Sequence, residues 1–240
     1  MLVNPATIAA LDRISARAAD VRMAFTPGAT PANDDVATAR PSARFTPDPL
    51  CIAAPPGDYF ITSDERGRRL YTRDGALSIE HGALCGRDGR PIFGYAGGSG
   101  TLGALAVDPV DAALGRITGA HIERDGSLVY ARKVIDPRTG AHEEQRVVAG
   151  RVALARFAAG TKLQSTDASH FAAPAGSIPH VGQPADAHFG AIAPQHREES
   201  RVDIDRALAR LKDAYLAFDA LAAGQTAQWG LGKTAMDLVK

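Results

Sequence analysis

Four histidines, with two nearby aspartates, are the residues of this sequence that are most suggestive of chemistry. These six side chains, all within residues 160–200, are His170, His180, His188, His196, Asp167 and Asp186. Imidazoles and carboxylates bind zinc, but a zinc site holds its ligands in a fixed tetrahedral frame. Successive histidine spacings of ten, eight and eight residues match no zinc-finger or zincin pattern. We interpret these histidines as solvated loop side chains, with a metal-dependent enzyme as an alternative hypothesis.

A second group of polar side chains lies in the run Tyr71-Thr72-Arg73-Asp74-Gly75. Its hydroxyl, guanidinium and carboxylate groups could suggest an active site. However, Asp-Gly pairs supply the positive φ that tight hairpins need, and Arg73 is able to pair with a carboxylate. We therefore predict a hairpin turn at Asp74-Gly75 and no catalytic role for this run.

The remaining candidate motifs also lack the context that their chemistry requires. The glycine-rich stretch Gly94–Gly100 has no following Lys-Ser/Thr, as a phosphate-binding loop would have. Ser63, Ser78 and Ser99 are not part of a nucleophile elbow. The sequence thus predicts a protein that is not an enzyme and that uses no cofactor or metal.

Composition excludes several further classes. The 240 residues carry 27 Lys+Arg and 27 Asp+Glu, and zero net charge argues against partners that rely on a cationic field, such as nucleic acid or anionic membranes. No apolar run approaches the roughly 20 residues of a transmembrane helix, and the first residues do not resemble a cleaved signal peptide. Cys51 and Cys85 are too few for a disulfide scaffold; we interpret them as free thiols, with one bridge as the alternative.

Both ends of the chain have the period of an amphipathic helix. Residues 5–25 and 202–223 are rich in strong helix formers, and apolar side chains recur three and four residues apart, as in a heptad stripe. The N-terminal stripe is Leu11, Ile14, Ala18, Val21 and Phe25, and the C-terminal one is Ile204, Leu208, Leu211, Tyr215, Phe218 and Ala222. Gly224 is the predicted end of the second helix, and the tail 225–240 is able to continue it.

Between the ends the apolar period changes to two, which indicates strands. Eight short runs are predicted as strands: Tyr59–Ser63, Leu70–Thr72, Ala76–Ile79, Ile92–Tyr95, Ile117–Glu123, Ser127–Val134, Gln145–Val148 and Arg151–Phe157. Turn signals such as His81-Gly82 and Asp125-Gly126 separate them. The sequence therefore predicts an antiparallel β domain over residues 57–158.

This pattern predicts a mainly β protein with α-helices, in which helices at the two ends flank an antiparallel β domain. We expect an N-terminal helix over 1–25, a Pro-rich linker over 26–56, an extended return segment over 159–200 and a C-terminal helix over 201–240. Isolated helices of this length are marginal in water, so we expect the two ends to pair as a coiled-coil-like stalk about 30 Å long. The alternative is an ordinary helical layer packed on the β domain.

Three blocks of the sequence resemble the flagellar hook–basal body rod family. The first spans Asp58–Tyr95 and includes Tyr71, Thr72, Arg73, Asp74 and Gly75. The second is Gly150–Phe157 followed by Leu163. The third leads into the C-terminal helix and includes Glu199, Ser200, Val202 and Asp203. The blocks follow the family's order, and the length is most similar to that of distal or proximal rod proteins.

The resemblance implies a structural subunit of the bacterial flagellar basal body. Such proteins pass through the flagellar type III export machinery without a cleaved signal and assemble helically with themselves and with other rod and hook proteins. Their terminal helices form the inner layer of a periplasm-spanning, torque-transmitting shaft. On this basis we expect the ten helical residues Leu11 to Phe25 and Ile204 to Phe218 named above to form the assembly interface. The alternative function is a β-rich periplasmic or cell-surface binding module with capping helices.

Overall fold

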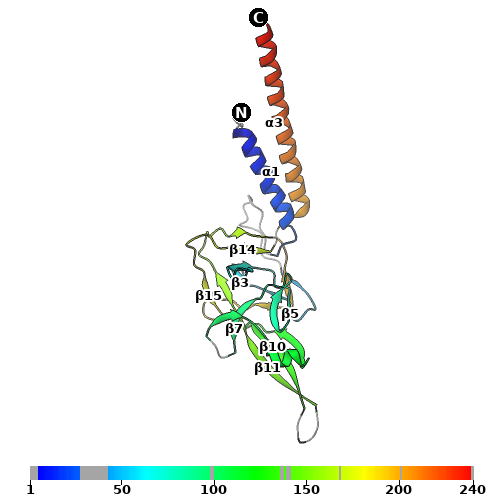
Figure 1. Ribbon diagram of the computed structural model, residues 1–240, viewed down its shortest axis with the longest axis vertical. Coiled ribbons are helices and arrows are strands. Elements are labelled where there is room, and N and C mark those ends of the chain that lie inside the picture. Colours follow the sequence, from blue (N-terminus) through cyan, green and yellow to red (C-terminus); the bar gives the residue numbers. More distant parts are fainter. Residues whose placement is uncertain are drawn as a thin grey trace. The chain divides into compact units, whose positions relative to one another are not determined.

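The computed structural model describes residues 5–27, 43–97, 100–135, 138, 142–167, 169–200 and 202–238, with side chains described as far as Ala227 (Figure 1). The chain forms two compact units. One combines the two chain ends, Met1–Ala39 and Ser200–Lys240, and the other is Arg40–Glu199. The predicted fold class is confirmed, because antiparallel sheets make up the central unit and a helix lies at each end of the chain.

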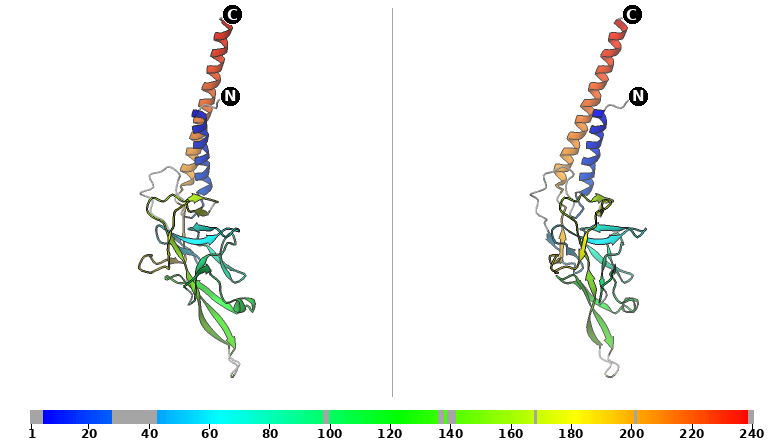
Figure 2. Two further views of the ribbon diagram at one scale, coloured as in Figure 1. Left: turned by 60° about the vertical axis from the view of Figure 1, so that its left-hand side comes forward. Right: turned by 90° about the vertical axis from the view of Figure 1, so that its left-hand side faces the viewer.

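The unit of the chain ends is an antiparallel pair of helices, α1 (Pro5–Met23) and α3 (Ile204–Leu238). They lie side by side in the views of Figure 2. The Gln225 amide donates a hydrogen bond of 3.0 Å to the Thr7 hydroxyl, whereas Ala24, at the other end of the pair, packs with Val202 and Ala207. The two terminal segments of the sequence therefore pair with each other along the length of α1.

Helix α3 continues past Gly224 to Leu238, so of the two outcomes that the sequence left open, a stop at Gly224 and a helix that includes the tail, the second is observed. A helical glycine costs only about 1 kcal/mol relative to alanine. Strong helix formers surround Gly224, and Leu221 and Gln225 on either side of it are both half-buried. Packing against α1 therefore offsets the weak propensity of the glycine.

The β unit contains a five-stranded sheet, a six-stranded sheet and three two-stranded ribbons, and the pairings between described strands are antiparallel. The five-stranded sheet has the order β8-β7-β11-β10-β9, with β7 (Phe93–Ala96), β8 (Leu102–Ala104), β9 (Ile117–Ile122), β10 (Ser127–Ile135) and β11 (His142–Val152). The six-stranded sheet has the order β13-β14-β4-β3-β12-β15, with β3 (Asp58–Ser63), β4 (Arg69–Thr72), β12 (Leu154–Arg156), β13 (Gln164–Ser165), β14 (His170–Ala172) and β15 (His180–Gly182). The ribbons pair β1 (Ala43–Phe45) with β17 (His196–Glu198), β2 (Ile52–Ala53) with β16 (Ala193–Pro194), and β5 (Leu77–Glu80) with β6 (Ala83–Gly86); a short helix, α2, spans Pro109–Ala113.

Each predicted strand overlaps an observed one, and two predicted turns are confirmed. His81 and Gly82 adopt φ values of 50° and 84° between the paired residues Glu80 and Ala83, which is the geometry of a two-residue hairpin. Gly126, with φ 82°, turns the chain between β9 and β10.

The predicted hairpin at Asp74-Gly75 is wrong. Strand β4 pairs with β3 and β14, whereas β5 pairs with β6, so the chain crosses between ribbon and sheet at this point. Gly75 is required for a different reason: a Cβ there would lie 1.7 Å from the Ile52 carbonyl oxygen. The Ile52 amide also donates to the Gly75 carbonyl at 2.9 Å, which holds the two backbones in close contact.

The two segments expected to be irregular contribute strands to the β unit. Strands β1 and β2 fall within the predicted linker 26–56, and β13 to β17 fall within the predicted return segment 159–200. Residues 28–42 lie outside the described part. These strands are only two or three residues long, too short for a period of two to be recognised. Most of them pair with distant segments, whereas β13 pairs with the neighbouring β14. The β domain therefore begins before residue 57 and ends after residue 158.

We predict that Gly75→Ala destabilises the β unit by at least about 2 kcal/mol, because the added methyl group meets backbone that must move. Gly103→Ala is the matched control, since a Cβ at Gly103 meets nothing within 4 Å. Urea unfolding followed by circular dichroism measures both variants. Equal unfolding midpoints would show that the close approach of Ile52 and Gly75 is not a constraint.

Candidate functional site

The helix pair packs through one stripe on each helix, in which alanines alternate with larger side chains. Buried or half-buried positions recur three and four residues apart, as expected for a coiled-coil-like contact. On α1 this contact stripe is Thr7, Ala10, Ile14, Arg17, Val21 and Ala24, and on α3 it is Ala207, Leu211, Ala214, Phe218, Leu221 and Gln225. Ala10, Ala24, Ala207 and Ala214 are its buried members, so the helices approach each other over alanines.

The sequence prediction placed part of this contact one residue too far along each helix. Ile14, Val21, Leu211 and Phe218 are on the contact stripe as expected. Four other predicted residues are exposed instead of packed. Their exposed fractions are 46% for Leu11, 76% for Phe25, 47% for Leu208 and 51% for Tyr215. A periodicity argument favours the larger apolar residue of each neighbouring pair, whereas close packing of two helices favours the alanine.

The two remaining predicted interface residues, Ala18 and Ile204, are neither fully buried in the helix contact nor fully exposed. Ala18 is half-buried, next to the contact position Arg17. Ile204 is also half-buried, and it packs against the small cluster of Ala24, Val202 and Ala207 at the start of α3. Both residues therefore flank the contact stripe.

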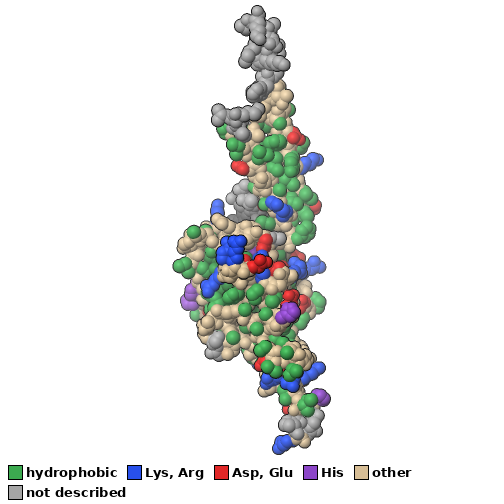
Figure 3. All heavy atoms as spheres, in the orientation of Figure 1, with side chains coloured by type: hydrophobic (Ala, Val, Ile, Leu, Met, Phe, Trp, Pro, Cys, Tyr) green, Lys and Arg blue, Asp and Glu red, His purple; other side chains and the backbone are tan. Residues whose placement is uncertain are grey.

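Three of these displaced residues, Leu11, Leu208 and Tyr215, together with Ile8 one turn from Leu11, form a second stripe, here called the exposed stripe. Leu11, Leu208 and Tyr215 each follow a buried alanine directly, so each lies about 100° around its helix from the contact stripe. Because α1 and α3 run antiparallel, the same rotation on both helices turns these side chains to one common face. Figure 3 shows hydrophobic side chains along both helices.

A contiguous exposed patch of large apolar side chains is typical of an interaction site. The buried alanines of the contact remove little apolar surface from water, at roughly 25 cal/mol per Å², and larger half-buried side chains such as Leu211 and Phe218 contribute the rest. Leu11, Leu208 and Tyr215 remain in solvent beside this contact. These exposed side chains are therefore available for contact with another molecule.

In the β unit, the predicted pairing of Arg73 with a carboxylate is confirmed. The Arg73 Nε and Nη2 atoms lie 2.6 and 2.5 Å from Glu198 Oε2, and both side chains are buried. The guanidinium also donates to the carbonyls of Ala54, Pro55 and Asp58. One buried cation thus joins three segments that are far apart in the sequence.

The neighbours of Arg73 in its motif also have structural contacts. The Tyr71 ring packs edge-on against Phe157 with centroids 4.8 Å apart, and the Thr72 hydroxyl donates to the Ser169 carbonyl at 2.7 Å. The Asp74 carboxylate accepts from the Ala76 amide at 3.2 Å. These contacts join the run to neighbouring strands and loops.

The residues that lead into α3 organise the start of that helix. The Ser200 hydroxyl donates to the Met23 carbonyl at 2.9 Å and accepts from the Val202 amide at 3.1 Å. The Asp203 carboxylate accepts from the amides of Asp205 and Arg206, which makes it the N-cap of α3. Glu199 forms an exposed ion pair with Arg44 at 3.9 Å.

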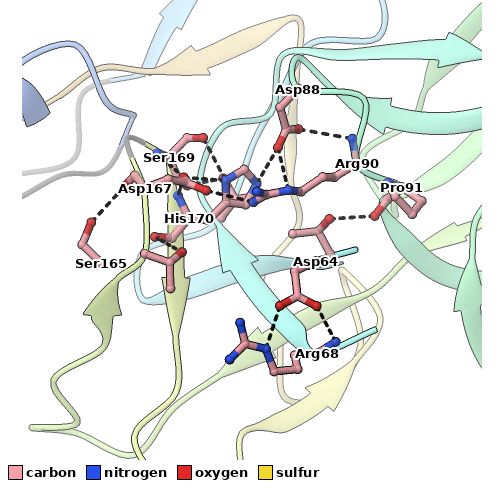
Figure 4. A network of polar contacts seen from close by, with 12 residues as sticks. Asp64, Arg68, Asp88, Arg90, Pro91, Ser165, Asp167, Ser169 and His170 are labelled. Atoms are coloured by element: carbon pink, nitrogen blue, oxygen red, sulfur yellow. Dashed lines mark hydrogen bonds and ion pairs between the residues drawn. The ribbon is translucent and has the colours of Figure 1, made fainter. Parts of the chain in front are cut away.

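A second polar network joins the loop before β14 to the turn between β6 and β7 (Figure 4). The buried His170 ring lies 2.8 Å from Asp167 and 3.5 Å from Asp88. Arg90 contacts the same two carboxylates, at 2.9 and 3.1 Å. Two carboxylates therefore alternate with the His170 ring and the Arg90 guanidinium around one centre. Sequence reasoning had interpreted His170 as a solvated loop residue, which is wrong for this histidine.

The other three histidines lie apart from this network. His180 packs against the rings of His188 and Phe189, and His196 packs against Phe45. Among the described residues, no group of three or more His, Cys, Asp or Glu side chains is placed to hold a metal ion. Cys51 and Cys85 are free and buried, and burial raises the pKa of both thiols. No helix in the described part is long and apolar enough to cross a membrane.

We predict that Arg73→Ala or Glu198→Ala costs about 3–5 kcal/mol of stability, because each leaves a buried charge without its main partner. Arg73→Met combined with Glu198→Met should cost less than the sum of the two single changes, because both charges are then removed together. Arg44→Ala, at the exposed pair with Glu199, is the control, with an expected change below about 1 kcal/mol. Additive single and double effects in denaturant unfolding would contradict this account.

We also predict that acid weakens the His170 network. Burial alone raises the pKa of Asp167, but hydrogen bonds from the Ser169 amide, the His170 ring and the Arg90 guanidinium hold it at about 2. Because the folded-state pKa is depressed, the stabilisation is present above the unfolded value near 4 and is lost as pH falls from about 4 to about 2. Asp167→Asn should flatten this part of the stability–pH curve. An unchanged slope in that variant would assign the acid sensitivity to other groups.

Comparisons with known proteins identify no family for this chain. No protein-family model matches the chain. The search of curated proteins found no match either. The family resemblance of the sequence therefore rests on the quoted residues themselves.

Proposed function

We propose that this protein is a structural subunit of the bacterial flagellar basal-body rod, which self-assembles helically through its terminal helices. The observation that carries the proposal is the exposed stripe on the helix pair. Large apolar side chains on one common face of α1 and α3 are suited to contacts with neighbouring copies. The three sequence blocks that resemble the rod family supply the identity of the assembly.

The β unit fits the same role as a rigid outer part of the subunit. The residues of the family-like motif are engaged in internal contacts: Arg73 with Glu198, Thr72 with Ser169, and Tyr71 with Phe157. A shaft that transmits torque needs subunits that resist deformation, and buried, multiply bonded side chains provide that resistance. The proposal assigns no chemical reaction to these residues.

The proposed role implies its partners and its location. The partners are other copies of this chain, other rod and hook proteins, and the flagellar type III export machinery. The assembled protein is located in the periplasm-spanning rod. Zero net charge means that long-range repulsion does not oppose the packing of identical subunits.

We predict that Leu11→Asp and Tyr215→Asp each weaken self-association by at least tenfold, because each places a charge in an apolar contact; burying such a side chain is worth about 1.5–3 kcal/mol. Ala217→Asp is the matched control, since Ala217 is exposed on the same helix but is turned about 160° from Tyr215. Sedimentation of the full chain over a concentration series measures association. Circular dichroism verifies that the helices persist in each variant.

Swimming of bacteria that carry each variant in place of the original chain tests the biological part. Loss of motility with Leu11→Asp and Tyr215→Asp, and normal motility with Ala217→Asp, is the expected result. Normal motility with all three variants would contradict the proposed function. So would a wild-type chain that stays monomeric at every concentration.

A further inference from the structure

Strands β10 and β11 continue beyond the rest of their sheet as a two-stranded arm (Figure 1). Strand β11 pairs with β10 as far as His142, but on its other side β7 pairs only with Gly150–Val152. The Gly97 amide, which donates to the Ala149 carbonyl at 3.0 Å, extends this cover by one residue. Among the described strands, none pairs with the second side of residues 142–148, which we call the open edge.

The open edge is suited to the addition of another strand. A two-stranded ribbon is marginally stable in water, and an edge strand carries unpaired amide and carbonyl groups that an extended segment is able to bond. Residues 142–146 are exposed, and Val148 has 44% of its surface in solvent. The backbone of the open edge is therefore accessible to an added strand.

The charges along the open edge fit a second copy of the same strand. Two identical strands that pair antiparallel about Gln145 place Glu144 of each copy opposite Arg146 of the other. Opposite charges in directly opposed positions stabilise a sheet, and like charges there destabilise it. The neighbouring registers, centred on Glu144 or on Arg146, place two like charges opposite each other. Charged residues usually protect an edge from strand addition, and of these three registers they favour one.

The surroundings of Glu144 and Arg146 are compatible with this register. Within each copy, Glu144 lies opposite Lys133 of β10, so the pairing of two copies puts its carboxylate between two cationic side chains. Arg146 forms an exposed ion pair with Glu123 at 2.8 Å, and the five N–H donors of a guanidinium allow it to contact a second carboxylate as well. The other opposed residues carry no like charges: His142 with Val148, and Glu143 with Val147.

We propose that the open edges of two copies of this chain pair antiparallel about Gln145 and join the two arms into one four-stranded sheet. The contact uses the same residues on both copies, so it is two-fold and closes after two subunits. Helical assemblies require head-to-tail contacts instead. The paired arms therefore describe a dimer outside the helical assembly, and this inference does not rest on the proposed function.

Charge reversal in the full chain tests this contact. Glu144→Arg and Arg146→Glu should each weaken the dimer by at least about tenfold, because like charges then face each other twice. The double variant restores opposite charges and should dimerise at least about fivefold more tightly than either single variant. Glu123→Gln is the control, since it removes only the partner of Arg146 within the same copy. Sedimentation measures the monomer–dimer equilibrium, and a double variant that dimerises no better than the single ones would overturn the proposal.

A cysteine at the centre of the two-fold contact gives a second test. Directly opposed residues of an antiparallel pair have Cα atoms about 4.5–5.5 Å apart, which is within disulfide reach, so Gln145→Cys should cross-link to its own copy under mild oxidation. Lys133→Cys is the exposed control, because three strand spacings put its Cα atoms at least about 14 Å apart. The native thiols Cys51 and Cys85 are buried and give little background. Larger assemblies that form without the cross-link at position 145 would overturn this contact and leave the helix-mediated assembly standing. A chain that never associates would overturn both proposals.

Discussion

The close approach of α1 and α3 over alanines is the constraint on which the rest of the account depends. Alanine lets two helix backbones approach, but it buries little apolar area. Each large apolar residue that follows such an alanine is turned by about 100° and remains in solvent. The same pairs of neighbouring residues, such as Ala10 with Leu11 and Ala214 with Tyr215, thus produce both a thin internal contact and an uncovered face. Under the proposed function, neighbouring copies cover that face.

The β unit is stabilised in a different way. Many of its strands are short, and the strands that they pair with are often distant in the sequence. Single buried contacts therefore have large effects on its stability. Arg73 bonds to Glu198 and to three carbonyls, and Gly75 admits the backbone of Ile52. These contacts explain why an Arg-Asp-Gly run is needed at a position that is not a turn. Rigid β units and an unsatisfied helix face together suit a protein whose role is to be a building block.

Much of this fold could be predicted from the sequence, for physical reasons that particular residues illustrate. Long runs of helix formers and local turns such as His81-Gly82 are encoded within a few residues. Strands β13 to β17 could not be predicted, because their positions depend on the strands that they pair with. Some of these partners are more than a hundred residues away in the sequence. The contact stripe was predicted only in part, at Ile14, Val21, Leu211 and Phe218, because hydrophobicity alone does not show whether the larger or the smaller apolar neighbour packs inside.

Labelling of single cysteines is the most direct test of the claim that other copies cover the exposed stripe. A thiol reagent is applied to Tyr215→Cys and Ala217→Cys proteins at increasing protein concentration, with the buried Cys51 and Cys85 as slow internal references. The account predicts that labelling at position 215 slows as the protein associates, while labelling at position 217 slows less. Equal labelling rates at the two positions at every concentration would contradict it.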